Sequence, residues 1–325
     1  RKRSDGFQGR SPAIAVAPLN SLSITGAIPP EGLKILSQSG QVVQVDLWDS
    51  DDVPVPRKEL LQKVKGARCA GLRAHGEDRR PNLRVLSTMS VGFDHLSLEE
   101  LKKRGIRVGY TPDVLTDSVA ELTVALLLTT SRRLIERPTP PSSSLCVSLS
   151  SGGWGTWRTL WLCGYELANS TVGILGLGRI GDRLKPFKVK KFIYTDVAPR
   201  PELASLINAE YVSMDELASQ SDFLTVCCAL TPETKDICNK DLFSKMKNTS
   251  IFINTREGWY TRRIWHEALS SGQIAGAGLD WTVPEPLPIS HPLFTLNNSC
   301  QCVLLTSSRN AMSALGQPMI KELKL

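Results

Sequence analysis

The segment TVGILGLGRIG (171–181) joins a continuous apolar run to three glycines in the spacing GxGxxG. Gly176 permits a tight turn after a strand, Gly178 lets a pyrophosphate approach the backbone, and Gly181 allows close packing of the following helix. Twenty residues after Gly176, Asp196 ends the next apolar run, where its carboxylate can accept hydrogen bonds from a ribose. The two features together favour dinucleotide binding over a purely structural glycine turn.

Strand and helix patterns alternate on both sides of this segment. Downstream, strands are predicted at 192–196, 222–230, 250–255 and 275–281, each preceded by a helical stretch. Upstream, strands are predicted at 41–48, 84–89 and 106–110, with helices at 54–65 and 98–104. A long apolar helix is predicted over 113–134, capped by Thr116 or Asp117. The alternation predicts an α/β fold with parallel sheets and a doubly wound nucleotide-binding domain in the second half.

The composition excludes several other classes of protein. The 325 residues are 41% hydrophobic and 22% charged, the balance of a globular protein with about two domains. No apolar run reaches the ~18 residues of a membrane span. The excess of seven positive charges is mostly scattered along the chain, so neither a membrane nor a nucleic acid is a predicted partner.

The eight cysteines lack CxxC pairs and zinc-site spacing, so no metal site is predicted. Cys227 and Cys228 lie in an apolar run and are expected to be buried, reduced thiols, which favours the cytosol. The arginine- and serine-containing start and the Leu-Lys-Leu ending indicate a mitochondrion or a peroxisome less strongly.

Several longer stretches carry a family resemblance. They are WDSDDVPVPRKEL (48–60), STMSVGFDHLSLEELKKRGIRVGYTPDVLTDSVAEL (87–122), GGWGTWRTLWLCGY (152–165), TVGILGLGRIG (171–181) and GLDWTVPEPLP (278–288). The chain resembles the D-2-hydroxyacid dehydrogenases, and within them the glyoxylate and hydroxypyruvate reductases. The resemblance implies two Rossmann-like doubly wound domains: a substrate domain of residues 1–114 and 307–325, and an inserted NAD(P)-binding domain of residues 115–306. It also implies a homodimer that reduces glyoxylate to glycolate and hydroxypyruvate to D-glycerate.

The resemblance further implies roles for single residues. Main-chain amides at Val91 and Gly92 would hold the substrate carboxylate, to which backbone donors are well suited. Arg256 would bind that carboxylate and polarise the C2 oxygen, and Glu285 would tune the pKa of a proton-transferring histidine. Trp154 and Trp157 would either reach into the partner subunit's substrate pocket or pack at the dimer interface.

The cofactor, NAD or NADP, would be held by residues of the second half. They are Thr116, Gly176, Leu177, Gly178, Arg179, Ile180, Gly181, Asp196 and Asp280, the last of which would lie near the nicotinamide. Asp196 favours NAD, because a carboxylate repels the 2′-phosphate of NADP, but the nearby Arg200 weakens that preference.

The sequence departs from the family pattern at several places. Thr306 runs directly into SSRNAMSAL (307–315), where the family has a Pro-His-x-Gly segment, and none of His75, His95, His266 and His291 is a good substitute. Pro186 falls in the helix after the glycines, so this helix is expected to be short. Residues 66–83 are expected to have lost a strand and much of a helix, and the proline- and serine-rich residues 137–151 are expected to form a loop. Both domains are therefore expected to be shortened in places.

Three interpretations follow. The first is a reductase whose missing histidine lowers its activity. The second is a catalytically silent NAD(P)-binding protein with a regulatory or interaction role, which binds cofactor without turnover. The third is a chain that does not fold stably, because lost helices leave apolar strands uncovered.

Overall fold

The structure, a computed structural model, describes parts of the chain between residues 22 and 301. These are residues 22–24, 45–47, 69–72, 85–88, 96–110, 115–134, 159, 163–178, 181–228, 231, 233–256, 262–280, 288, 290–296 and 298–301. The chain separates into two compact units, Arg1–Pro112 with Met312–Leu325, and Asp113–Ala311. Within the described residues, no helix is long and apolar enough to cross a membrane.

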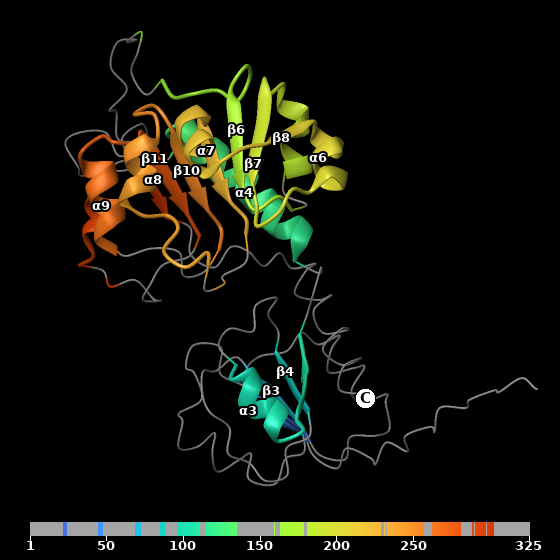
Figure 1. The fold of residues 1–325 in the computed structure, drawn as a ribbon. Coiled ribbons are helices and arrows are strands. Elements are labelled where there is room, and N and C mark those ends of the chain that lie inside the picture. The colour runs from blue at the N-terminus through green and yellow to red at the C-terminus, as the bar shows by residue number, and fades with distance from the viewer. Residues whose placement is uncertain are drawn as a thin grey trace, which may run out of the picture. The chain divides into compact units, whose positions relative to one another are not determined.

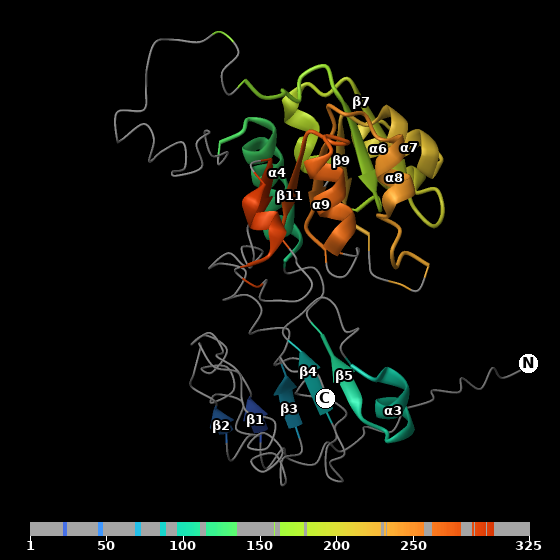
Figure 2. The same ribbon diagram turned by 90° about the vertical axis from the view of Figure 1, so that its left-hand side faces the viewer.

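The first unit contains a parallel sheet of five strands (Figure 2). The strands are β1 (Leu22–Ile24), β2 (Val45–Leu47), β3 (Cys69–Leu72), β4 (Val85–Thr88) and β5 (Arg107–Gly109). Their order in space, β2-β1-β3-β4-β5, is that of a doubly wound sheet. The helix α3 (Leu98–Lys103) buries Leu101, as predicted for 98–104.

The expected loss of a strand from residues 66–83 is wrong. Cys69–Leu72 form β3, which pairs in parallel with both β1 and β4 and so lies in the middle of the sheet. The run CAGL is short and contains glycine, so its pattern gave little sign of a strand. The predicted helix over 54–65 and the expected loop over 137–151 lie outside the described residues.

The second unit contains a parallel sheet of seven strands (Figure 1). The strands are β6 (Thr171–Leu175), β7 (Lys191–Thr195), β8 (Ala209–Tyr211), β9 (Phe223–Val226), β10 (Ile251–Asn254), β11 (Gly276–Leu279) and β12 (Ser299–Gln301). Their order is β8-β7-β6-β9-β10-β11-β12, so the chain reverses its direction of winding between β6 and β9. This is the Rossmann order, in which ligands bind beside that reversal at the carboxyl ends of the strands.

Helices cover both faces of this sheet. They are α4 (Thr116–Ser131), α6 (Pro201–Ile207), α7 (Met214–Gln220), α8 (Lys240–Lys245) and α9 (Arg262–Ser270), with the 3-10 helices η1 (Gly181–Phe187) and η2 (Pro292–Thr295). The predicted cap of α4 is wrong, because the helix already includes Thr116 and Asp117. Leu115 takes the N-cap position and makes no side-chain hydrogen bond there.

Alternate residues of each strand face different helices. Val172 and Ile174 belong to a cluster with α4, η1 and α6, whereas Leu175 belongs to a cluster with α7, α8 and α9. We call these the α4 face and the α9 face of the sheet. Near-continuous apolar strands therefore arise because both sides of each strand are buried.

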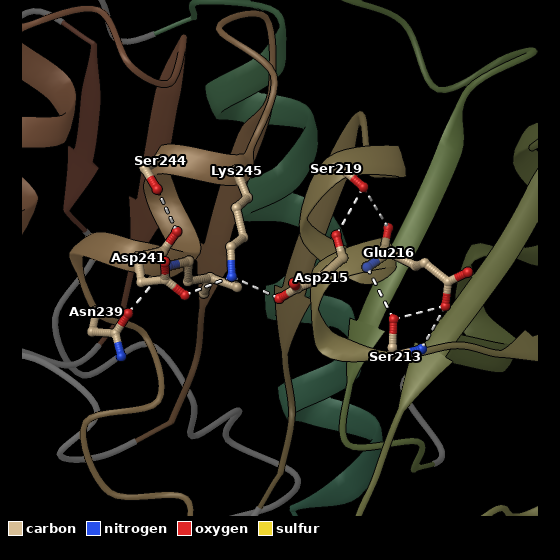
Figure 3. A network of polar contacts seen from close by, with 9 residues as sticks. Ser213, Asp215, Glu216, Ser219, Asn239, Asp241, Ser244 and Lys245 are labelled. Atoms are coloured by element: carbon tan, nitrogen blue, oxygen red, sulfur yellow. Dashed lines mark hydrogen bonds and ion pairs between the residues drawn. The ribbon is translucent and has the colours of Figure 1, made fainter.

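A polar network joins α7 to α8 on the surface of the α9 face (Figure 3). Lys245 Nζ lies 2.7 Å from both Asp215 Oδ1 on α7 and Asp241 Oδ2 on its own helix. The hydrogen bond to Asp215, followed by that to Asp241, raises the pKa of Lys245. At the start of α7, Ser213 and Glu216 form a reciprocal capping box. Exposed pairs of this kind contribute little to stability.

Candidate cofactor site and active site

The glycine turn follows β6 directly. Gly176 has φ +86°, and its N–H donates to Thr195 O at 2.8 Å. A Cβ placed on Gly176 would lie 2.3 Å from Cys228 Cβ and 2.5 Å from Cys228 Cα. Both the positive φ and this close approach require glycine, so the predicted tight turn is confirmed.

The space beside the next glycine is open. A Cβ placed on Gly178 would meet no atom of the described residues within 4 Å, as expected where a ligand is to approach the backbone. Arg179 and Ile180 lie outside the described residues, and Gly181 begins η1.

The expected short helix after the glycines is confirmed. The residues 181–187 form a 3-10 helix that contains Pro186, which has no N–H to donate and cannot sit inside an α-helix without kinking it. Leu184 is fully buried and joins the core of the α4 face, so packing is kept although the helix is short. The glycine turn fits a dinucleotide. A long α-helix with its N-terminus pointing at the pyrophosphate is replaced here by the short 3-10 helix η1.

Asp196 follows the last residue of β7. Its Oδ2 accepts a hydrogen bond from Leu177 N–H at 3.1 Å, and its Oδ1 accepts one from Val197 N–H at 2.8 Å. The carboxylate therefore lies against the glycine turn. Because a carboxylate offers about four acceptor positions, capacity remains for the hydroxyls of a ribose. Arg200 Nε lies 3.3 Å from Asp196 Oδ2.

Two thiols lie at the carboxyl end of β9, where the predicted strand 222–230 is shorter than expected. The N–H groups of Cys227 and Cys228 both donate to Leu175 O, at 2.9 and 3.1 Å. Burial raises the pKa of Cys227 to about 11 and that of Cys228 to about 12, so both are neutral thiols near pH 7. They are free, as expected, and so are Cys163, which is exposed, and Cys238, which is buried. The contact of Cys228 with Gly176 had no signal in the sequence.

Arg256 lies beyond the carboxyl end of β10 and is held by Asn254. The buried Asn254 donates from Nδ2 to Arg256 O at 3.0 Å and accepts from Arg256 N–H at Oδ1 at 3.1 Å. Thr255 Oγ1 lies 3.1 Å from Thr123 Oγ1 of α4, which ties the same turn to a helix. Arg256 Nε is buried, and no residue of the described part of the chain accepts a hydrogen bond from it. Sequence reasoning missed Asn254, although it immediately ends an apolar strand.

Asp280 lies at the carboxyl end of β11 and is buried, with its N–H donating to Asn254 O at 3.0 Å. Asn254 thus joins the two strand ends that carry Arg256 and Asp280. Thr116, the first residue of α4, is half-buried. Seven site residues of the sequence analysis lie outside the described residues, namely Val91, Gly92, Trp154, Trp157, Arg179, Ile180 and Glu285.

Two histidines are described. His266 lies on α9, and His291 caps η2 by accepting from Leu293 N–H at Nδ1 at 3.2 Å. His75 and His95 lie outside the described residues.

The strand order, the glycine turn and the carboxylate at the end of β7 define a dinucleotide-binding Rossmann domain. Residues 125–307 match the family model described as D-isomer specific 2-hydroxyacid dehydrogenase, NAD binding domain. The chain belongs to this family, whose cofactor is NAD or NADP.

Relatives match along nearly the whole chain. The chain is 50% identical to the glyoxylate reductase/hydroxypyruvate reductase of Homo sapiens, over 94% of this chain and 98% of the human protein. It is 38% identical to the glyoxylate reductase of Thermofilum pendens, over 85% of this chain and 81% of that protein. The crystal structure of the TT0316 protein from Thermus thermophilus is similar with a TM-score of 0.81 and 31% identity, over 94% of this chain and 97% of that one.

Proposed function

We propose that this protein reduces glyoxylate to glycolate and hydroxypyruvate to D-glycerate with NADH or NADPH. The observation that carries the proposal is the 50% identity to the human reductase over nearly the full length of both chains. The glycine turn and Asp196 support it, because they form the half of the site that holds the cofactor's adenosine. Bound NAD(P)H would supply the hydride.

The proposal gives each residue of the active site a task. Arg256 would bind the substrate carboxylate through its planar guanidinium, while the buried Asn254 holds the Arg256 backbone in place. Val91 and Gly92 would donate backbone N–H groups to the same carboxylate, and Glu285 would tune the pKa of the group that transfers the proton. We assign substrate binding to the unit that contains both chain ends. A homodimer with Trp154 and Trp157 at its interface, located in the cytosol, completes the proposal.

The proposed reaction needs a proton donor, and the family's histidine is absent from its usual place in this sequence. The sequence contains no histidine after His291, although the family places one in a Pro-His-x-Gly segment beyond the last strand. Loss of a general acid lowers rates by about 10² to 10⁴. This observation favours a second candidate function, a catalytically silent NAD(P)-binding protein.

The test combines two measurements on one preparation: oxidation of NADH and NADPH with each substrate, and the rise in melting temperature that each cofactor causes. Turnover supports the reductase, and a cofactor shift without turnover supports the silent protein. Absence of both would overturn cofactor binding altogether.

Arg256→Gln tests the assignment of the substrate site. We expect it to remove turnover and keep the thermal shift, because Arg256 is assigned to substrate. The matched control is Arg132→Gln, which changes an exposed arginine at the end of α4. Unchanged turnover in Arg256→Gln would contradict the role of Arg256.

A further inference from the structure

A buried pair of threonines joins α4 to the turn that carries Arg256. Thr123 Oγ1 on α4 lies 3.1 Å from Thr255 Oγ1, and Thr123 Oγ1 also donates to Val119 O at 2.7 Å. Because a hydroxyl has only one hydrogen to donate, the Thr255 hydroxyl must donate to that of Thr123. The hydrogen bonds therefore run in one direction, from the residue after β10 to the backbone of α4.

The pair lies among apolar side chains. Thr123 is 0% exposed and Thr255 is 3% exposed. The buried residues Ala120, Leu126 and Leu127 of the same helix belong to the core of the α4 face. Replacing both partners of a buried hydrogen bond by apolar groups of the same shape is nearly neutral for stability, so two valines would serve folding about as well. The two hydroxyls are therefore not needed for folding alone.

Helix α4 is a fixed support for this contact. It packs against β10 and β11 (Figure 1). A Cβ placed on Gly278 of β11 would lie 2.7 Å from Thr130 Oγ1 and 3.4 Å from Leu126 Cβ, so the helix lies close to the sheet. A helix packed this closely cannot shift along the sheet without repacking the core. The bond between Thr123 and Thr255 thus ties the turn to a rigid element.

Asn254 holds the same turn from the other side. Its side chain accepts from Arg256 N–H at 3.1 Å and donates to Arg256 O at 3.0 Å, and its own carbonyl accepts from Asp280 N–H at 3.0 Å. Thr255 lies between Asn254 and Arg256 in the chain, so its hydroxyl fixes the middle of the turn to α4. No described residue accepts a hydrogen bond from Arg256 Nε, which is buried. The direction of the guanidinium therefore depends on where the backbone is held.

A guanidinium binds a carboxylate best through two parallel N–H bonds, which requires accurate placement. A displacement of about 1 Å can cost about a hundredfold in rate. We propose that Thr123 and Thr255 are positioning residues for Arg256, and that their hydrogen bond holds the guanidinium where the substrate carboxylate binds. The inference rests on the proposed function, because that function assigns Arg256 to the carboxylate. The pair acts through Arg256 and contacts neither substrate nor cofactor.

The test is calorimetric titration of the full chain, saturated with NADH, with oxalate as the carboxylate probe. The double variant Thr123→Val with Thr255→Val should bind oxalate about tenfold more weakly, as is typical when a coupled contact is lost. Its affinity for NADH should not change. The KM for glyoxylate should rise by a similar factor with a smaller fall in kcat, because binding of the carboxylate is lost in both the ground state and the transition state.

Two single variants separate the hydroxyl from the rest of the side chain. Thr255→Ser keeps the hydroxyl and should keep the oxalate affinity. Thr255→Val removes the bond but leaves the Thr123 hydroxyl paired with Val119 O. It should weaken oxalate binding in the same direction, and it replaces the double variant if that protein does not fold.

Hydrogen exchange of the Arg256 amide tests the contact without substrate. This N–H is held by Asn254 Oδ1, and we expect it to exchange at least about tenfold faster in the double variant, because the turn opens more often. The matched control is Thr130→Val, on the same face of α4, where Thr130 is buried and no described residue pairs with its hydroxyl. The control should change neither the exchange rate nor the oxalate affinity.

The outcomes distinguish the two proposals. Unchanged exchange in the double variant would overturn the claim that the pair holds the turn. Faster exchange with unchanged oxalate affinity, or a loss in Thr255→Ser equal to that in Thr255→Val, would overturn the positioning role and leave the reductase standing. Oxalate binding that is absent from the unchanged protein, or that survives Arg256→Gln, would overturn the substrate role of Arg256 and the positioning role with it.

Discussion

Both faces of the seven-stranded sheet are buried, but different elements cover them. The α9 face is covered by three α-helices and by an aromatic cluster of Phe243, Phe252 and Trp265, with ring centroids 4.6 to 5.3 Å apart. The α4 face is covered by α4 and α6, and the element between the glycine turn and β7 is only a 3-10 helix. The difference teaches that the sheet requires buried apolar side chains more than it requires regular helices.

The largest effect is expected on the α9 face. Trp265→Ala should lower the free energy of unfolding by about 3 to 5 kcal/mol, because it removes a fully buried side chain, the largest among the described residues, from between two phenylalanines. Urea denaturation monitored by circular dichroism measures the change. Trp265→Phe should cost less, since it keeps the apolar contact. A loss below about 1 kcal/mol for Trp265→Ala would mean that this face is loosely packed.

A substitution on the α4 face tests whether the short 3-10 helix η1 is part of the core. Leu184→Ala should cost about 2 to 4 kcal/mol, because Leu184 is fully buried although it lies on a 3-10 helix. The exposed Leu206 on α6 is the control, and Leu206→Ala should change stability by less than about 0.5 kcal/mol. If Leu184→Ala were as mild as its control, the shortened element would not be part of the core.

The sequence was sufficient for the central parts of the fold, because apolar runs and the glycine spacing report burial and a tight turn directly. Five predicted strands of the second unit, from 171–175 to 275–281, all occur. The short strands β1, β8 and β12 were not predicted. The equally short β2 and β5 were predicted because they lie within the longer patterned stretches 41–48 and 106–110. Strand β3 was judged lost, yet pairing with two neighbours stabilises it.

Site residues divide in the same way. Gly176 and Asp196 were found because their spacing reflects a local turn and a strand end. The contacts of Asn254 with Arg256 and of Tyr194 with Arg200 depend on how side chains meet after folding, and no motif encodes them. Residue spacing therefore predicts turns and strand ends, whereas tertiary packing determines which side chains support them.

The last comparison uses one buried thiol from each face of the sheet. Cys227 belongs to the α4 face and Cys238 to the α9 face, and burial raises the pKa of both above the ordinary value. Because the folded state favours the neutral thiol, the stability from each is complete below pH 9 and falls as the pH rises beyond it. From pH 9 to about 11, the Cys227 thiol should lower the folding equilibrium constant about tenfold per pH unit, relative to Cys227→Ala.

Above about pH 11 the losses of stability due to Cys227 and to Cys238 should differ. The loss due to Cys227 should level off as the folded protein releases that proton, whereas the loss due to Cys238 should continue, since burial raises its pKa further. Denaturation of the two alanine variants and the unchanged protein under reducing conditions measures both slopes, with the exposed Cys163→Ala as control. A Cys227→Ala variant that keeps the full alkaline loss would mean that this thiol contacts water in the folded state, and that the α4 face is open beside the glycine turn.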